Sequence, residues 1–246
     1  MRRLIPHRNA VYRNAHEGMN ILMRPIAILP GIAFLGGLLL VGAANGAPRT
    51  YIYTVEHPLY GNIGTYTHII DGADGVTSID SQLHLAVRIL GVVIYREDAD
   101  QIEVLRGTHL ISFRSVTEKD GKQIRVLGEA KDNGFAITSP SGTILAPADV
   151  VPVNPWSLTQ VGTGVVVSIN SGEIDNVAVT GGEVTLVSLN GKSTRAHLFH
   201  VRTDLQPDKW EVWFNEDGVP IKVRSLEAGT PIDFLLSSPS SALRPR

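Results

Sequence analysis

Histidine side chains are the groups in this sequence best suited to acid–base or metal chemistry, because imidazole titrates near neutral pH and binds transition metals. Six of them fall in segments with strand-like alternation: His57, His68, His84, His109, His197 and His200. His197 and His200 are three residues apart, so on a strand they point to opposite faces and cannot share one metal ion. A hairpin could bring His68 and His84 together, but no carboxylate stands at ligand spacing beside them. We therefore expect no metal site and no cofactor.

Sequence templates for catalysis are absent. The chain has no Gly-x-Ser-x-Gly elbow, His-Glu-x-x-His pair, P-loop or dinucleotide-binding glycine motif. It contains no cysteine, so it also lacks a thiol nucleophile and thiolate metal ligands. The acidic run of Glu97, Asp98 and Asp100 lacks the glycine and the distant glutamate of a calcium loop, and we interpret it as a solvated hairpin loop. We expect no catalytic residues. An enzyme is kept as an alternative, because catalytic triads are recognised by geometry and not by sequence.

Aromatic side chains are concentrated in "WEVWFNEDGVPIKVRS", residues 210–225. Alternation places Trp210, Val212 and Phe214 on one face of a strand and Trp213 on the other. A two-residue turn at Asp217-Gly218 would give these pairs: Glu211 with Arg224, Val212 with Val223, Trp213 with Lys222, and Phe214 with Ile221. The segment is therefore predicted to be a hairpin with one apolar, core-facing side.

Trp213 is the aromatic residue that this alternation leaves unexplained, because it stands on the charged face. It contacts either a ligand or a neighbouring loop, with the stem of Lys222 alongside. If the apolar face lines a cavity, Trp210 and Phe214 are wall residues, and the isolated Trp156 lies in the segment that would cover it. The candidate ligand-binding residues are thus Trp156, Trp210, Trp213 and Phe214.

Period-2 alternation of apolar and polar residues recurs after Pro48, and helical periodicity does not. In "SQLHLAVRI", for example, Leu83, Leu85, Val87 and Ile89 share one face. Turn signals of the Asp-Gly and Asn-Gly kind arrive about every 8–12 residues. These features predict an all-β fold, in which a long antiparallel meander of about a dozen strands forms a curved sheet or half-barrel.

One segment interrupts this rhythm. Residues 146–160, "APADVVPVNPWSLTQ", hold three prolines and show no alternation. Because proline removes ladder donors, we predict a crossover loop or short helical lid here. It joins strand sets at about 50–146 and 161–237, which we interpret as halves of a single β domain over residues 48–237. The polar tail, residues 238–246, is predicted to be disordered.

The N-terminus has the pattern of an export signal. In residues 1–47, five arginines precede an uncharged apolar run that ends in small residues, which predicts a secretory signal peptide with an apolar helix. A start at Met19 or Met23 would give it a more usual length. The alternative is an inner-membrane anchor through residues 25–44. Either way we expect an exported protein, periplasmic or secreted.

Charge limits the partners. Removing residues 1–47 takes away five Arg and one Glu, which shifts the formal net charge from −2 to −6. No Lys- or Arg-rich run is left, so neither nucleic acid nor anionic lipid is an expected partner. Membrane contact is expected only through an uncleaved N-terminus.

Three segments resemble an uncharacterised family of exported, β-rich bacterial proteins, a domain of unknown function. They are "YTVEHPLYGNIGTYTHIID", with its Gly-x-Ile-Gly turn; "QIEVLRGTHLISFRSVTEKDGKQIRV", with Glu103, Gly107 and Leu110; and "WEVWFNEDGVPIKVRSLEAGTPIDFLL", with its closing Trp-(Tyr/Phe)-x-(Asp/Glu)-x-Gly hairpin. The resemblance covers most of residues 50–237. The family's meander is similar to the half-barrel of periplasmic lipoprotein carriers (LolA/LolB-like), which enclose acyl chains under a lid. This implies a fold and not a function, and the lipoprotein cysteine of some carriers is absent.

We therefore predict an exported cell-envelope protein without catalytic activity, which holds a lipid, another hydrophobic molecule or an envelope protein on a curved sheet. One alternative is an envelope hydrolase with an unrecognised His/carboxylate site. Another is a structural assembly component whose exposed strand edges pair with a partner. An apolar cavity of roughly a few hundred Å³ would favour the binding role, and a filled core a scaffold role.

Overall fold

The computed structural model describes residues 47–153, 163–204 and 210–241, all of which belong to one compact unit. These residues contain strands and no helix. The first strands are β1 (Arg49–His57), β2 (Gly61–Ala73), β3 (Val76–Ile89), β4 (Val92–Arg106), β5 (His109–Lys119), β6 (Lys122–Lys131), β7 (Gly134–Ser139) and β8 (Gly142–Ala146). The remaining strands are β9 (Val151–Pro152), β10 (Thr163–Val167), β11 (Ile174–Leu189), β12 (Lys192–Thr203), β13 (Trp210–Phe214), β14 (Pro220–Glu227) and β15 (Thr230–Ser241).

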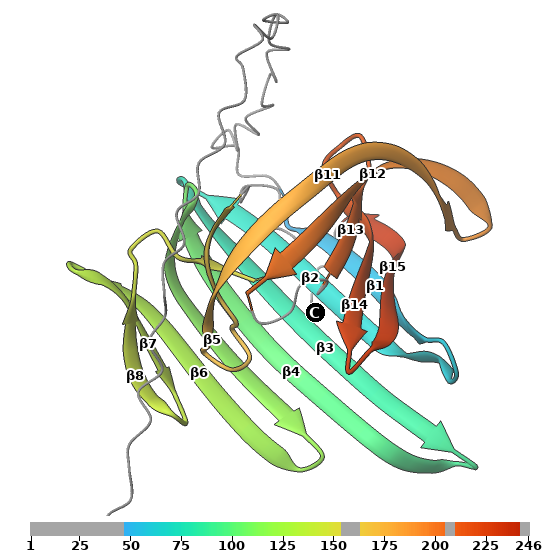
Figure 1. The fold of residues 1–246 in the computed structure, drawn as a ribbon, viewed down its shortest axis with the longest axis horizontal. Coiled ribbons are helices and arrows are strands. Elements are labelled where there is room, and N and C mark those ends of the chain that lie inside the picture. The colour runs from blue at the N-terminus through green and yellow to red at the C-terminus, as the bar shows by residue number, and fades with distance from the viewer. Residues whose placement is uncertain (1–46, 154–162, 205–209, 242–246) are drawn as a thin grey trace, which may run out of the picture. The chain divides into compact units, whose positions relative to one another are not determined.

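All fifteen strands form one sheet, in the order β8-β7-β6-β5-β4-β3-β2-β1-β15-β14-β13-β12-β11-β10-β9. Neighbouring strands of this sheet pair antiparallel, except that β9 lies parallel to β10. The first and last strands, β1 and β15, pair with each other, so the two halves of the chain meet in the middle of the sheet (Figure 1). The predicted all-β meander on a curved sheet is confirmed, with fifteen strands where about a dozen were expected.

Several sequence predictions differ from the structure in detail. Val151 and Pro152, in the segment predicted to be a lid, form the short edge strand β9, while residues 154–160 lie outside the described part of the chain. The predicted signal helix also lies outside it. β15 continues to Ser241, past the predicted strand end at residue 237. The acidic run from Glu97 to Asp100 belongs to the long strand β4 and not to a hairpin loop.

The β13–β14 hairpin confirms most of its predicted register. Glu211 pairs with Arg224, Val212 with Val223 and Trp213 with Lys222. Phe214, however, pairs with Pro220 and not with Ile221, because a bulge follows Trp213 and residues 215–219 form the loop. The side chain of Asn215 causes this longer loop: its Oδ1 accepts hydrogen bonds from the backbone N–H groups of Asp217 and Val219, at 3.1 and 2.8 Å.

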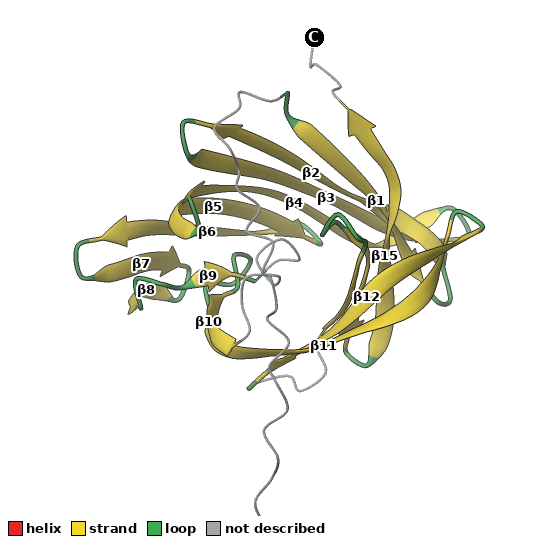
Figure 2. Cartoon of the chain, turned by 90° about the horizontal axis from the view of Figure 1, so that it is seen from above, coloured by secondary structure: helices red, strands yellow, loops and turns green. Residues whose placement is uncertain are grey.

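The sheet rolls up until its two ends touch, as the view in Figure 2 shows. No ladder joins β8 to β9; they are the outer strands of the described sheet. The ends are instead joined by a hydrophobic cluster in which Phe113, Phe135 and Ile137, from β5 and β7, pack with Val150, Val167 and Ile169 at the other end. Asn170 adds a polar link, because its Oδ1 accepts hydrogen bonds from Gln101 Nε2 of β4 and Thr117 Oγ1 of β5.

Close packing at this junction requires glycine at two positions. A Cβ on Gly128 would lie 2.1 Å from Cε1 of Phe113 and 2.5 Å from Cε1 of Phe135, two rings that stack 5.9 Å apart. Gly172, in the β10–β11 turn, has a φ of +78° and faces Ser139, Val126 and Ile137. Gly128 therefore lets the two rings lie over β6, and Gly172 lets the β10–β11 turn approach β6 and β7 closely.

We predict that Gly172→Val destabilises the protein more than Gly191→Val. Gly191 has a nearly identical φ of +75° but nothing within 4 Å of its Cβ position, so it reports the cost of backbone strain alone. Overpacking of the junction should cost Gly172→Val about 1–3 kcal/mol more, measured by urea unfolding. Equal losses for the two variants would show that the turn does not close the sheet.

Candidate functional site

The rolled sheet surrounds a cavity of about 820 Å³. Its walls are inward-facing positions of β1–β5 on one side and of β10 and β13–β15 on the other, because alternate residues of a strand point to the same face. Most lining side chains are aromatic or aliphatic, among them Tyr53, Tyr66, Leu83, Trp210, Val223 and Phe234. Its size and lining are those of a small-molecule site, which typically measures about 300–1,000 Å³.

An aromatic cluster forms the centre of one wall. Tyr53 and Tyr66 are cross-strand partners on β1 and β2, with ring centroids 6.4 Å apart. Phe234 of β15 meets Tyr66 edge to face at 5.7 Å. Burial raises the pKa of both tyrosines, and the charge of Glu103 raises that of Tyr66 further. Both are therefore neutral phenols; Tyr53 donates its hydroxyl hydrogen to the carbonyl oxygen of Pro220, at 2.8 Å.

A row of buried polar side chains crosses the sheet beside this cluster. His68, Ser81, Gln101 and Ser115 are direct neighbours on β2, β3, β4 and β5, and none is more than 6% exposed. Ser81 Oγ lies 2.8 Å from His68 Nδ1, and Gln101 donates to Asn170. The Ser115 hydroxyl has no hydrogen-bond partner. Of the row, His68 and Gln101 also line the cavity.

Burial keeps His68 neutral. It lowers the pKa of the imidazole from 6.5 to about 3. The rings of Tyr66 and Tyr53 meet His68 edge-on, with centroids 4.3 and 6.1 Å away, and they add no charge that would favour the imidazolium. The row contains no lysine or arginine. It therefore offers a bound molecule hydrogen-bond donors and acceptors, and no positive charge.

We call the end of the cavity that is lined from the β1–β2, β3–β4 and β14–β15 turns its mouth; Tyr60, Ile94 and Ala228, in or beside these turns, belong to the lining. Tyr95 and Glu97 of β4 line it, together with Lys119 of β5. The Tyr95 hydroxyl donates to Glu97 Oε2, and Lys119 Nζ lies 3.8 Å from the same oxygen and 5.2 Å from the centre of the Tyr95 ring. One side of the mouth is thus polar and internally paired.

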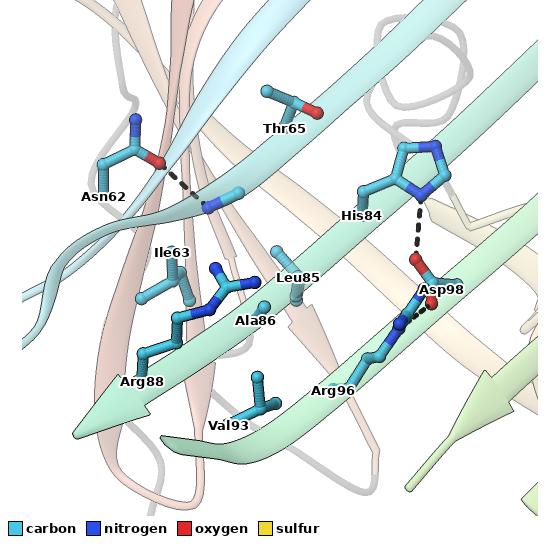
Figure 3. A pocket seen from close by; sticks show the side chains of 11 residues that line it. Asn62, Ile63, Thr65, His84, Leu85, Ala86, Arg88, Val93, Arg96 and Asp98 are labelled. Carbon is cyan, nitrogen blue, oxygen red and sulfur yellow. Dashed lines mark hydrogen bonds and ion pairs between the residues drawn. The ribbon is translucent and has the colours of Figure 1, made fainter. Parts of the chain in front are cut away.

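A second, shallower groove of about 480 Å³ lies on the outer face of β2–β4 (Figure 3). His84 Nδ1 lies 2.8 Å from Asp98 Oδ1, and Arg96 Nε lies 2.6 Å from Asp98 Oδ2. The hydrogen bonds from His84 and Arg96 lower the pKa of Asp98. His84 is well exposed and its partner is satisfied, so this is a surface ion-pair network. Arg88 stands at the same groove.

The predicted ligand-binding residues are separated by the structure. Trp210 lines the cavity. Phe214 lies in a core cluster with Val212 and Val166, and Trp213 lies in another cluster under Lys222, whose Nζ is 4.9 Å from the indole. Neither side chain is among those that line the cavity, so Phe214 is not a wall residue and the packing interpretation of Trp213 accounts for it. Trp156 lies outside the described residues.

The predicted histidines are likewise dispersed. His68 and His84 do not meet, because His68 points inward and His84 outward from neighbouring strands. His57 accepts a hydrogen bond from the Leu59 N–H at the β1–β2 turn, and His109 is exposed. No group of three or more His, Cys, Asp and Glu side chains within the described ranges is placed to hold a metal ion.

The residues that sequence reasoning missed are the inward-facing polar ones, Ser81, Gln101 and Glu103. A signal for Ser81 was present. Leu83, Leu85 and Val87 point inward, and alternation places Ser81, two residues before Leu83, on the same inward face. Ser81 is thus a polar residue at a core position. Glu103 is only 1% exposed although it is a carboxylate. Of these three residues Gln101 lines the cavity, whereas Ser81 and Glu103 are buried without lining it.

Comparisons with known proteins agree with the fold. The family profile described as "Domain of unknown function (DUF6134)" matches residues 61–237. No curated protein matches the sequence. Among solved structures, the chain is similar to a β-barrel-like protein of the domain of unknown function DUF1849 from Brucella abortus, with a TM-score of 0.58 and 10% sequence identity over 78% of this chain and 97% of that one. This likeness concerns the fold alone. In the part of the chain that the structure describes, no helix has the length and apolarity needed to cross a membrane.

We predict that His68 makes stability fall with acidification. Because the folded protein binds a proton on His68 only near pH 3, while the unfolded chain binds it near pH 6.5, the contribution is complete above pH 6.5 and is lost as the pH falls toward 3. Between pH 7.5 and 5.0 the free energy of unfolding should drop by about 2 kcal/mol from this group. His68→Gln should remove this part of the pH dependence in urea unfolding, and the surface variant His84→Gln should retain it. A pH dependence unchanged in His68→Gln would contradict the assignment.

We also predict opposite effects for two serines of the same row. Ser81→Ala leaves the buried Nδ1 of His68 without its partner and should cost about 1–3 kcal/mol. Ser115→Ala removes a hydroxyl that has no partner and should leave the free energy of unfolding unchanged or raise it by up to about 1 kcal/mol. Urea unfolding of both variants at pH 7.5 distinguishes them, and similar losses would argue against a structural Ser81–His68 bond.

Proposed function

We propose that this chain, which belongs to the DUF6134 family of domains of unknown function, is a non-catalytic binding protein of the cell envelope. It holds a hydrophobic molecule inside its rolled sheet. The cavity carries this proposal. It measures about 820 Å³, and Tyr53, Tyr66, Phe234 and Trp210 give it large apolar surfaces. A filled core, as expected of a pure scaffold, would leave no such space.

The chemistry of the walls narrows the class of molecule. Its apolar part would lie against the aromatic cluster, where stacking and burial of surface contribute most. A polar end would reach the row that contains His68 and Gln101, which supplies hydrogen bonds without positive charge. The ligand we propose is therefore an amphiphile with a hydrogen-bonding, uncharged polar group. The likeness to lipoprotein carriers, which enclose acyl chains, supports this class only by analogy of fold.

A hydrolase is the second candidate, because Ser81 Oγ and His68 Nδ1 lie 2.8 Å apart at the cavity wall. Two observations weigh against it. A histidine with a pKa of about 3 is a poor general base near neutral pH. The backbone N–H groups around Ser81 belong to the ladders of β2, β3 and β4, which leaves no pair of free donors for an oxyanion. We therefore propose that the pair orients the polar row and performs no catalysis.

A structural assembly role would use β8 and β9, the outer strands of the described sheet, and Ile144 and Leu145 of β8 are half-exposed. This role gives no reason for the cavity, so we rank it below binding. Export to the periplasm or the medium, or anchoring through residues 25–44, is part of the proposal. It rests on the basic and apolar pattern of residues 1–47, which lie almost wholly outside the described part of the chain.

We predict that the protein, purified after expression of the whole chain, binds the neutral apolar dye N-phenyl-1-naphthylamine with a rise in dye fluorescence. Leu83→Trp places extra volume in the cavity and should weaken binding about tenfold, a loss of about 1.4 kcal/mol. The control Leu127→Trp makes the same change at an outward-facing, half-exposed position of β6 and should bind like the wild type. Native mass spectrometry should reveal a co-purified amphiphile. If the wild type binds no dye and carries no such molecule, the binding role is wrong.

A further inference from the structure

Two turns at the cavity mouth carry exposed apolar side chains, which we call the apolar rim: Leu59, Tyr60, Leu90, Val92, Val93 and Ile94. Leu59 is 82% exposed and Leu90 is 100% exposed. The turns are neighbours because Gly64 of β2 pairs with Leu85 of β3 close to both of them. The start of β2 lies three residues before Gly64, and the end of β3 lies four residues after Leu85. Figure 1 shows the β1–β2 and β3–β4 turns at the same end of the sheet.

Leu90 departs from the usual turn chemistry, and among the described residues only Ala228, at the β14–β15 tip, does so besides it. It has a left-handed backbone, with φ +51°, and precedes Gly91 at the tip of the β3–β4 hairpin. Asp74, Asp120 and Asn190 occupy the same conformation before a glycine at three other hairpin tips, as expected of residues that tolerate it. A leucine there is strained, and its full exposure means that no packing within the fold compensates the strain.

A cation stands directly behind this tip. Arg88 lies two residues before Leu90, about 7 Å along the strand at about 3.3 Å per residue. It faces the outer groove, where Val93 is its cross-strand partner, and no carboxylate of the described residues forms an ion pair with it (Figure 3). Arg96 lies further from the tip, opposite Ala86, and already pairs with Asp98. The hairpin thus ends in an apolar layer backed by a guanidinium group.

We propose that the apolar rim inserts into the surface of a phospholipid bilayer. Interfacial elements bury their apolar side chains about 5–10 Å into the headgroup region, which corresponds to two or three residues of a strand. At that depth Leu90 and Val92 meet acyl chains, and Arg88, with its cross-strand partner Val93 at the same height, lies at the level of the lipid phosphates. Apolar burial supplies the attraction, so zwitterionic lipid suffices, in keeping with a chain whose formal net charge is −2. This contact differs from the membrane contact expected from the sequence, which involved only the N-terminal segment.

The rim is also continuous with the cavity. Tyr60 and Ile94 belong to the rim and to the cavity lining alike, so an apolar surface leads from the bilayer to the interior. A sparingly soluble ligand can pass along this surface without crossing water. This step rests on the proposed function, whereas insertion of the rim stands on the exposed side chains, the strained leucine and Arg88.

The test uses the absence of cysteine from the sequence. In the whole chain, Val92→Cys carries the polarity-sensitive label NBD, and Val184→Cys, a half-exposed valine of β11 away from the rim, carries it in the control. Added phosphatidylcholine vesicles should raise the emission of the label at 92 at least about twofold, as expected for transfer from water to the bilayer interface. A nitroxide on the acyl chains should then quench it. The label at 184 should not respond.

Leu90→Asp suits the turn, as Asp74 and Asp120 do. It should raise the lipid concentration needed for the vesicle response at 92 about tenfold, as expected for removal of one buried leucine.

Each outcome decides the proposal. A label at 92 that stays as water-exposed as the label at 184 overturns it, even if the N-terminal segment holds the protein on the vesicles. A change at 92 that depends on protein concentration and needs no vesicles also overturns it, in favour of contact between two copies. Dye binding by the same proteins without vesicles tests the cavity separately, so failure of the rim and failure of the ligand role are distinguishable.

Discussion

Within the described residues, side-chain packing and not backbone pairing closes the sheet, and the rest of the structure depends on that contact. A barrel closed by hydrogen bonds has a radius determined by strand number and shear. Here β8 and β9 are ladder edges, and the ends are joined through Phe113, Phe135 and Val167 and through the amide of Asn170. Such a junction leaves the sheet free to roll around a cavity of about 820 Å³ instead of collapsing onto a filled core.

The polar row follows from the same geometry. A curved sheet with an open interior presents inward positions that are buried from bulk solvent and yet not packed against a second layer. Most polar side chains there bond to one another, as Ser81 does with His68 and Gln101 with Asn170, whereas the Ser115 hydroxyl has no partner. The pairing explains why a histidine is stable in the wall without charge, and it gives the cavity a polar side that a simple apolar core would lack.

The alternation of the sequence was enough to predict the all-β meander, most turns and three of four pairs in the β13–β14 hairpin, because strand periodicity and turn residues are local properties. It could not place the site. Phe214 and Trp213 had the composition of ligand contacts, but both faces of β13 are buried, one against Val166 and Val201 and the other against Ile221. Which face of a strand borders a cavity depends on how a sheet rolls, and that depends on contacts between residues as distant as Thr117 and Asn170. The bulge after Trp213 was missed because the Asn215 side chain selects a longer loop than Asp-Gly alone favours.

Departures from local rules carry the functional information in this chain. Among the described residues, Asp or Asn occupies three of the five left-handed hairpin tips that are not glycine, and most buried positions are apolar. Leu90 departs from the first tendency, as Ala228 does at the β14–β15 tip, and His68, Ser81 and Glu103 depart from the second. A sequence specifies its structure most simply when every level agrees, so positions that disagree with their local preference indicate a requirement from outside the fold. Leu90 lies on the hairpin beside the cavity mouth and His68 lies in the cavity wall, with Tyr60, Ile94 and Tyr66 lining the surface between them. The interior and its entrance therefore form one continuous surface, polar at its inner end and apolar at the rim.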